Sequence, residues 1–361
     1  MKKSTENGAK ALLKRIEETA FFAHYSLLGD GNIRHYDWEK LSAKMTGLEK
    51  GLWQFLLLGQ SMTRAEATEL LGLPALKFLR RHNLCVASKG KVSMGGVRLV
   101  RYWGMSFFIE RGAVAASYIG DDAKALLAIL PNLTRGRCLS LYTASGLEVM
   151  PLVAAAKVQL NFAGPRANEN ILRANLALNA AEEKPVSWRF SRNGCGSYDL
   201  IVSNPPCYFQ APGVTMAKFA SAGPDGLKYV RKVLKAASTE LAPGGLALTT
   251  FAFFAPVEAA AMEQRLRALL DPYGLNYLVA VTSKLLMEPG VPIFNHMISS
   301  TVISGEPEVA GVMSKTMEHI RRRQFGAVHL LKARFWKSQS GRTLDRQITN
   351  YSDSYYGLWT I

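Results

Sequence analysis

The sequence predicts an α/β protein with a mostly parallel sheet, preceded by a smaller helical domain. Three observations support this fold class. Apolar β-type runs alternate with helical segments from residue 137 to residue 270, the pattern of parallel strands with crossover helices. The first 110 residues instead space their apolar side chains mainly as helices do. Finally, the apolar run 198–203 ends abruptly at Asn204-Pro205-Pro206.

Residues 1–110 are predicted to form a helical, winged-helix-like N-terminal domain. Glu66 follows Thr63 by three positions, as in a capping box, and marks a helix start. The predicted elements from that point are helices over 63–71 and 75–81 and a β pair over 84–87 and 91–103. Winged helices bind nucleic acid, pack against other domains or cover a substrate site, and the sequence leaves these roles open.

Residues 111–305 are predicted to form the main α/β domain, and residues 306–361 a basic C-terminal extension. The expected order is a helix over 124–130, strand 137–141, helix 148–156, strand 158–162, helix 166–178, strands 186–190 and 198–203, helix 225–241, strand 246–253, helix 256–270, and an antiparallel pair 277–283 and 297–303. Strands that alternate with helices in this way favour a parallel sheet.

The double proline Pro205-Pro206 ends the strand and leaves polar groups at its carboxyl end. Proline cannot donate to a sheet ladder, and it biases the preceding residue toward extended geometry, so Asn204 lies just beyond the carboxyl end of its strand. Ligands of open α/β sheets bind at that edge. The Asn204 amide carbonyl and the backbone carbonyls of Ser203 and Asn204 can accept N–H groups there. Such an arrangement of acceptors is suited to hold a planar amide or amino nitrogen in one orientation.

The segment 197–209, SYDLIVSNPPCYF, resembles the [D/N]-P-P-[Y/F] motif of class I S-adenosylmethionine (SAM) methyltransferases that act on amino or amide nitrogens. It is most similar to release-factor glutamine methyltransferases and small-domain rRNA guanine methyltransferases. The LAPGG turn at 241–245 and the helix 173–179 match further family motifs, and the resemblance covers about 134–304. It implies a Rossmann-like class I methyltransferase sheet in a catalytic domain, SAM as cofactor, and methyl transfer to a nitrogen.

Several positions depart from the family pattern. The first strand of the family ends in the acid that opens the glycine-rich turn D-x-G-x-G-x-G, whereas here Ser140 replaces that acid and only Gly146 remains of the glycines. Ala163 occupies the place of the ribose-binding acid at the end of the second strand. The third acid would fall near Ser191 and Arg192. The SAM-binding motifs are therefore degenerate.

The resemblance nevertheless implies a set of site residues. Tyr142 would stack on SAM over Gly146, and Glu148 would offer a carboxylate. The expected cofactor-binding residues are Ser140, Tyr142, Thr143, Ser145, Gly146, Ala163 and Asn204, and the expected catalytic residues are Asn204, Pro205 and Tyr208. Cys207 stands where the family has an aromatic residue, so Tyr208 either stacks on the acceptor or joins Phe209 in a hydrophobic lid.

Two other functions are consistent with the positions that depart from the family pattern. Loss of the acid at Ser140 suits an enzyme such as an azetidine-2-carboxylate synthase, in which the SAM amine attacks the γ-carbon and methylthioadenosine leaves. A degenerate methyltransferase that serves as an RNA-binding scaffold is the third interpretation. Formation of methylthioadenosine without an acceptor distinguishes the cyclase, and salt-sensitive RNA binding without SAM affinity distinguishes the scaffold.

Charge, cysteine spacing and hydropathy indicate which partners and which cellular location to expect. The net charge of +16 favours RNA or a ribosomal protein as a partner, unless the charge is simply spread over solvated helix faces. The four cysteines have no C-x-x-C spacing and the six histidines form no ligand pairs, so neither a metal site nor a disulfide framework is expected. No apolar run reaches membrane-spanning length and no signal peptide precedes the domain, so we expect a cytoplasmic protein without membrane partners.

Overall fold

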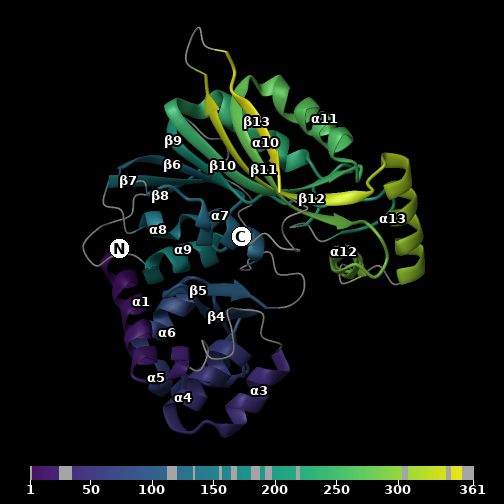
Figure 1. The fold of residues 1–361 in the computed structure, drawn as a ribbon. Coiled ribbons are helices and arrows are strands. Elements are labelled where there is room, and N and C mark those ends of the chain that lie inside the picture. Colours follow the sequence, from purple (N-terminus) through teal and green to yellow (C-terminus); the bar gives the residue numbers. More distant parts are fainter. Residues whose placement is uncertain are drawn as a thin grey trace. The chain divides into compact units, whose positions relative to one another are not determined.

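The computed structural model describes most of the chain (Figure 1). The described residues are 2–23, 35–111, 120–132, 135–153, 157–163, 169–179, 188–191, 197–216, 220–302, 308–338 and 343–351. They divide into two compact units: unit 1 comprises Met1–Ile119, Ala144–Gly146 and Pro165–Pro185, and unit 2 comprises Gly120–Thr143, Leu147–Gly164 and Val186–Ile361. None of the helices among these described residues is both long and apolar enough to cross a bilayer.

Unit 1 is mainly helical. Its elements are α1 (Lys2–Glu17), α3 (His35–Lys44), α4 (Gly47–Leu52), the π-helix η1 (Trp53–Leu58), β1 (Met62–Thr63), α5 (Arg64–Leu71), α6 (Leu73–Arg81), β2 (Cys85–Ser88), β3 (Lys91–Met94), β4 (Val97–Tyr102), β5 (Met105–Glu110) and α9 (Glu169–Asn179). Strands β1, β3 and β2 form one small sheet, and β4 and β5 form another. The unit buries aromatic side chains, among them Trp38, Trp53 and Phe78.

Two local predictions for unit 1 have opposite outcomes. The capping box at α5 is confirmed, because the Glu66 N–H donates to Thr63 Oγ1 at 3.2 Å and the Thr63 N–H donates to Glu66 Oε2 at 2.6 Å. The single strand predicted over 91–103 is wrong: it divides into β3 and β4 around Gly96, whose φ of +77° lies in the region that glycine favours. Each half pairs with a different partner strand.

Unit 2 contains the α/β sheet. Its elements are α7 (Asp121–Ala128), β6 (Arg135–Leu141), η2 (Leu147–Val149), α8 (Met150–Val153), β7 (Lys157–Ala163), β8 (Trp188–Ser191), β9 (Tyr198–Ser203), α10 (Lys228–Glu240), β10 (Leu241–Ala255), α11 (Ala259–Leu270), η4 (Asp271–Tyr273), β11 (Leu275–Leu286), α12 (Pro292–Val302), α13 (Val309–Arg323), β12 (Ala327–Lys337) and β13 (Arg346–Asn350). The alternation predicted from the sequence therefore holds over most of this unit.

The strand order confirms the predicted Rossmann-like sheet. Eight strands lie in the order β13-β11-β12-β10-β9-β6-β7-β8. Counted from β6, the parallel strands follow the 3-2-1-4-5 order of a doubly wound sheet. β12 runs antiparallel to both β10 and β11, as the class I methyltransferase resemblance implies, and β13 adds a parallel edge strand to β11.

The long strand β10 divides the core of unit 2 into two layers. Phe251 and Phe253 lie in the cluster that contains the buried residues of α10 and α11. Ala252 and Phe254 lie in a second cluster with α12 and α13. Because successive side chains of a strand point to opposite faces, the sheet is covered on both sides here. Figure 1 shows α10 and α11 beside the strands β10 and β11.

The strand predicted over 297–303 is wrong. This segment lies mostly in α12, and the antiparallel strand of the sheet is β12, which lies within the predicted C-terminal extension. Phe294, Met297, Ile298 and Thr301 are all buried. Their spacing of i, i+3, i+4 and i+7 is that of one helix face, so the apolar, β-branched composition misled the prediction while the helical period was present.

Candidate active site

The candidate site lies where the order of the strands reverses. From β6 the chain proceeds outward through β7 and β8 and then returns to β9, on the opposite side of β6. The carboxyl ends of β6 and β9 are aligned, with Leu141 opposite Ser203. The buried Ser203 hydroxyl donates to the Leu141 carbonyl at 3.0 Å. In doubly wound sheets ligands bind at this switch point, beyond the carboxyl ends of the strands.

The turn after β6 contains two residues in the left-handed region of backbone space, and one of them is not a glycine. Tyr142 has φ +62° and Gly146 has φ +83°. The Tyr142 N–H donates to the carbonyl of Ala163, at the end of β7, at 2.9 Å. A left-handed conformation costs a non-glycine residue about 1–2 kcal/mol, and such strain concentrates at ligand sites. Tyr142 thus keeps, just after β6, a backbone conformation that glycine adopts without strain.

The Tyr142 side chain is held by a second aromatic ring. Its ring lies edge-on to Tyr229 of α10, with centroids 4.9 Å apart and planes at 64°. Burial, together with Tyr229, raises the pKa of Tyr142 to about 12, so the phenol is neutral near pH 7. The half-buried ring offers an aromatic face rather than a charge.

Asn204 is fixed by two polar side chains. Its Nδ2 donates to Asp122 Oδ2 of α7 at 2.9 Å, and its Oδ1 accepts from Thr250 Oγ1 of β10 at 3.3 Å. Thr250 is fully buried, and its hydroxyl also lies 3.3 Å from the Asp122 carbonyl oxygen. The amide is therefore oriented, with one lone pair of its carbonyl oxygen still able to accept a further N–H group.

A buried carboxylate lies near the end of β6. The Glu148 side chain of η2 is 2% exposed. Burial raises the pKa of Glu148, the nearby hydroxyls of Thr143 and Ser140 partly oppose this, and the charge of Asp122 adds to it. Among the described residues, Glu148 Oε1, Ser140 Oγ and Thr143 Oγ1 are buried without meeting the geometry of a hydrogen bond. These three atoms lie close to one another without well-aligned hydrogen bonds, and buried polar atoms of this kind gain from a polar partner.

Comparisons with known proteins give fold-level likenesses only. No family model matches the chain, and no curated protein matches it. The solved structures that resemble it are distant in sequence. One is P. horikoshii TYW2 in complex with MeSAdo, with 13% identity and a TM-score of 0.39 over 84% of this chain and 99% of that one.

Two further structures illustrate the range of likeness. M. jannaschii TYW2 in complex with AdoMet has 11% identity and a TM-score of 0.37, over 68% of this chain and 91% of that one. A Haemonchus contortus phosphoethanolamine N-methyltransferase 2, crystallised with S-adenosylhomocysteine, has 13% identity and a TM-score of 0.34 over 60% of this chain. The chain spans about half of that protein, 52% of its length.

The residues expected from the sequence fall into separate groups in the structure. Ser140 and Thr143 lie near Glu148, and Tyr142 is bonded to Ala163 through the backbone. Asn204 belongs to the group with Asp122 and Thr250. The two remaining cofactor positions, Ser145 and Gly146, are buried in unit 1, where the Ser145 carbonyl accepts from Asn175 Nδ2 at 2.8 Å.

Tyr208 and its neighbours pack against aromatic side chains of unit 2. The half-buried Tyr208 ring lies edge-on to Phe254 at 6.4 Å, and its backbone bonds to Ala220 and Ala222. Phe209 is fully buried among aromatic side chains. Burial raises the pKa of the Cys207 thiol to about 12, which disfavours the thiolate that a nucleophile requires.

Sequence reasoning missed Asp122 and Thr250. Asp121-Asp122 stands at the start of α7, a common place for aspartate that does not by itself indicate a site. Thr249 and Thr250 interrupt an otherwise apolar strand, and both are buried. A pair of polar residues inside a buried strand is the signal that could have pointed to Thr250, since buried hydroxyls need partners. Within the described part of the chain, no cluster of three or more His, Cys, Asp or Glu is placed to hold a metal ion.

Proposed function

We propose that this chain is a SAM-dependent methyltransferase that transfers a methyl group to an amide or amino nitrogen held by Asn204. The observation that carries the proposal is the position of Asn204 at the switch point, with its amide oriented by Asp122 and Thr250. A planar nitrogen that donates to Asn204 Oδ1 and to a freed backbone carbonyl would be held in one orientation. Pro205, which is buried and has no N–H group to donate, cannot continue the sheet ladder at this point.

The residues at the end of β6 fit the polar groups of SAM. Glu148 Oε1 and the Ser140 and Thr143 hydroxyls are buried atoms that need partners, and an ammonium group offers up to three donors. Tyr142 offers an aromatic face for the adenine, and Ser145, Gly146 and Ala163 complete the proposed set of cofactor-binding residues. Glu148 would thus replace the acid that is absent at Ser140.

The chemical demand on the protein is positional. When bound, SAM supplies a methyl carbon whose bond to sulfur breaks as a bond to nitrogen forms, and the nitrogen loses a proton. Asn204 and its neighbours orient the acceptor and limit its motion, and such positioning accounts for a large share of the acceleration of a two-substrate reaction. In this proposal Tyr208 flanks the acceptor side of the loop.

A non-methylating use of SAM is the second candidate, and the absence of an acid at Ser140 favours it. In that reaction the buried Glu148 carboxyl group, which lies near Ser140 and whose pKa burial raises, would serve as the proton acceptor. A base that takes a proton from the SAM ammonium leaves a free amine. The amine lone pair then attacks the γ-carbon, the carbon–sulfur bond breaks, and methylthioadenosine leaves with the bonding electron pair.

The proposal also covers the methyl acceptor and the N-terminal domain. The acceptor is unidentified, and RNA or a ribosomal protein is the class that the net charge of +16 favours. Helices α5 and α6 with the hairpin β2–β3 have the element order of a winged helix, and we propose that residues 1–110 form such a module. A separate role for residues 111–305 and 306–361, and a cytoplasmic location, stay predictions.

The decisive experiment is calorimetric titration of the purified protein with SAM, followed by mass spectrometry of the mixture without an acceptor. Binding with SAM intact supports the methyltransferase. Release of methylthioadenosine with a new cyclic amino acid supports the second candidate. Absence of binding overturns both and leaves an RNA-binding scaffold, which salt-sensitive RNA binding would then support.

A further inference from the structure

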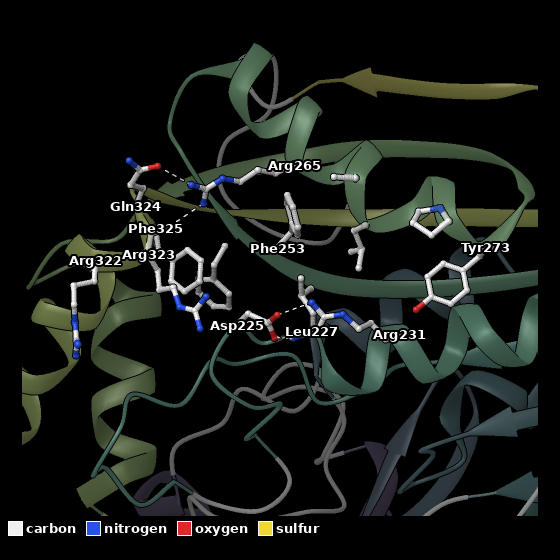
Figure 2. Close-up of a pocket in the computed structure, with 14 residues that line it drawn as sticks. Asp225, Leu227, Arg231, Phe253, Arg265, Tyr273, Arg322, Arg323, Gln324 and Phe325 are labelled. Carbon is white, nitrogen blue, oxygen red and sulfur yellow. Dashed lines mark hydrogen bonds and ion pairs between the residues drawn. The ribbon is translucent and has the colours of Figure 1, made fainter.

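A groove in unit 2 gathers arginines from three helices. Its volume is about 580 Å³, and it lies between α10, α11 and the end of α13. The arginines that line it are Arg231, Arg265, Arg322 and Arg323, against a single lining carboxylate, Asp225. Figure 2 shows Arg231 reaching toward Asp225 and Arg265 reaching toward Gln324, whereas Arg322 points away from the other arginines.

The internal partners of these arginines leave a positive excess. Arg231 is neutralised by Asp225 through contacts of 2.6 and 3.3 Å. Arg265 donates to the Arg323 carbonyl at 3.0 Å and to Gln324 Oε1 at 2.7 Å, both uncharged acceptors. The groove therefore holds Arg265 in a defined place without cancelling its charge. Arg323 is exposed beside it.

The end of α13 explains only part of this arrangement. The Phe325 N–H donates to the Ile320 carbonyl at 3.0 Å and the Gln324 N–H to the Arg321 carbonyl at 3.2 Å, which is a Schellman ending with Gln324 in the left-handed region. Basic residues are common at such helix ends because they offset the helix dipole. Arg231 and Arg265 come from other helices and do not belong to that local pattern.

The floor of the groove is aromatic. Phe253 and Phe325 are buried beneath the arginines, and Tyr273 of η4 keeps part of its ring exposed. Figure 2 shows Tyr273 and the two phenylalanines around the same hollow as Arg231 and Arg265. Guanidinium groups bind phosphate oxygens in pairs, and exposed aromatic rings stack on bases. The lining thus combines the two contacts that a nucleotide requires.

We propose that this groove binds a nucleoside phosphate, with Arg265 and Arg323 on the phosphate and Tyr273 on the base. The same chemistry occurs in a free nucleotide and in a single-stranded RNA chain, and the experiment below separates the two sources. The inference does not depend on methyl transfer, because it uses none of the residues at the end of β6 or β9.

The groove is joined to the loop that follows Asn204. A Cβ added at Gly226, between two lining residues, would lie 2.7 Å from the Cys207 carbonyl oxygen. Phe254, another lining residue, packs its ring 4.8 Å from that of Phe209. The lining of the groove therefore packs against residues that follow the Asn204-Pro205-Pro206 segment in the chain.

The test is fluorescence anisotropy of the full chain with a labelled single-stranded RNA of about ten nucleotides, within the range of known binding-site sizes. Measurements at about 0.15 M salt limit the effect of distant charges, since the Debye length there is about 8 Å. We expect Arg323→Glu and Arg265→Gln each to weaken binding about tenfold, and to lower the slope of log K against log salt by about 1. Arg321→Glu is the matched control, because Arg321 lies in the same helix turn but does not line the groove.

Two further measurements locate the ligand and identify its source. RNA that carries 4-thiouridine should cross-link to the peptide that contains Tyr273, and thermal unfolding of each variant shows that the chain remains folded. Competition by AMP would assign a free nucleotide, and RNA binding without such competition would assign a chain. Equal losses in Arg321→Glu and Arg323→Glu, cross-links confined to other peptides, or failure of both RNA and AMP to bind would each overturn the proposal.

Discussion

The side-chain amide of Asn204 donates to the carboxylate of Asp122 at 2.9 Å, across 82 positions of sequence. The bond joins the end of β9 to the first turn of α7. Thr250 completes the contact by donating to the Asn204 carbonyl oxygen. Because both halves of the amide are engaged, the Asn204 side chain cannot rotate freely, and the lone pair it presents at the switch point has a fixed direction.

Substitution of Asn204 tests its role in orienting an acceptor. We expect Asn204→Ala to lower SAM turnover about 100-fold, because loss of positioning by about 1 Å is enough for an effect of that size. Turnover is measured as release of S-adenosylhomocysteine or methylthioadenosine. Thr250→Val keeps the shape but removes one hydrogen bond, so its loss should be nearer tenfold. Wild-type turnover in Asn204→Ala would contradict the assignment.

Glu148 should destabilise the folded chain as the pH rises. Burial raises its pKa above the ordinary value of 4.5, so the folded chain keeps a proton that the unfolded chain releases. The stability that this proton confers is fully present below about pH 4.5 and is lost as the pH rises through the raised pKa. We therefore expect Glu148→Gln to increase the free energy of unfolding at pH 8, by about 1 kcal/mol or more.

The same substitution should weaken SAM binding, and the opposite signs of the two effects distinguish a ligand-binding carboxylate from a structural one. Glu240→Gln is the matched control. Burial also raises the pKa of Glu240, at the end of α10, but none of the proposed cofactor contacts involves it. Chemical denaturation and calorimetry of both variants provide the comparison. Equal SAM affinity in Glu148→Gln and the wild type would exclude Glu148 from the cofactor site.

Two substitutions of Tyr142 separate the contribution of its ring to SAM affinity from that of its backbone conformation. Tyr142→Phe keeps the ring against Tyr229, so we expect unchanged affinity for SAM. Tyr142→Gly removes the ring but suits the backbone at φ +62°, since glycine adopts that conformation without strain. Stacking of a base on an aromatic ring contributes about 1–3 kcal/mol, so affinity should fall about tenfold or more. Tighter binding by Tyr142→Gly would show that the ring obstructs the cofactor.

His82 should make unit 1 sensitive to acid. Burial, with Arg81 and Arg173 nearby, lowers its pKa from 6.5 to about 4. In the unfolded chain the imidazole is protonated below about pH 6.5, whereas in the folded chain it stays neutral down to about pH 4. The free energy of unfolding therefore falls as the pH drops from about 6.5 to about 4. Between pH 7.5 and pH 5 we expect a loss of roughly 2 kcal/mol, measured by urea denaturation.

His82→Phe provides the control for this loss. The His82 ring lies edge-on to Phe78 at 4.8 Å, and phenylalanine keeps an aromatic ring in that place without a titrating group. The variant should lose much less stability between pH 7.5 and pH 5. An acid sensitivity equal to that of the wild type would assign the effect to other groups.

Much of the fold was predictable because it depends on local chemistry. The alternation of apolar strands and amphipathic helices along 137–286 appears in the sequence as a change of period, and the structure follows it. The last antiparallel strand was misplaced because a β-branched segment at 292–302 forms a helix. The true strand, β12, occurs about 30 residues later, in a segment whose charge indicated an extension.

The alternation of elements along most of the sheet and the position of Asn204 at a strand end follow from the sequence, since both depend on neighbours along the chain and on the geometry of proline. The contacts of Asp122 and Thr250 with this amide, and the groove lined by arginines from α10, α11 and α13, arise only in the folded chain. The same holds for the raised pKa of Glu148, which follows from burial. The reason is that contacts between residues far apart in sequence are set by strand order and packing, which no local pattern encodes.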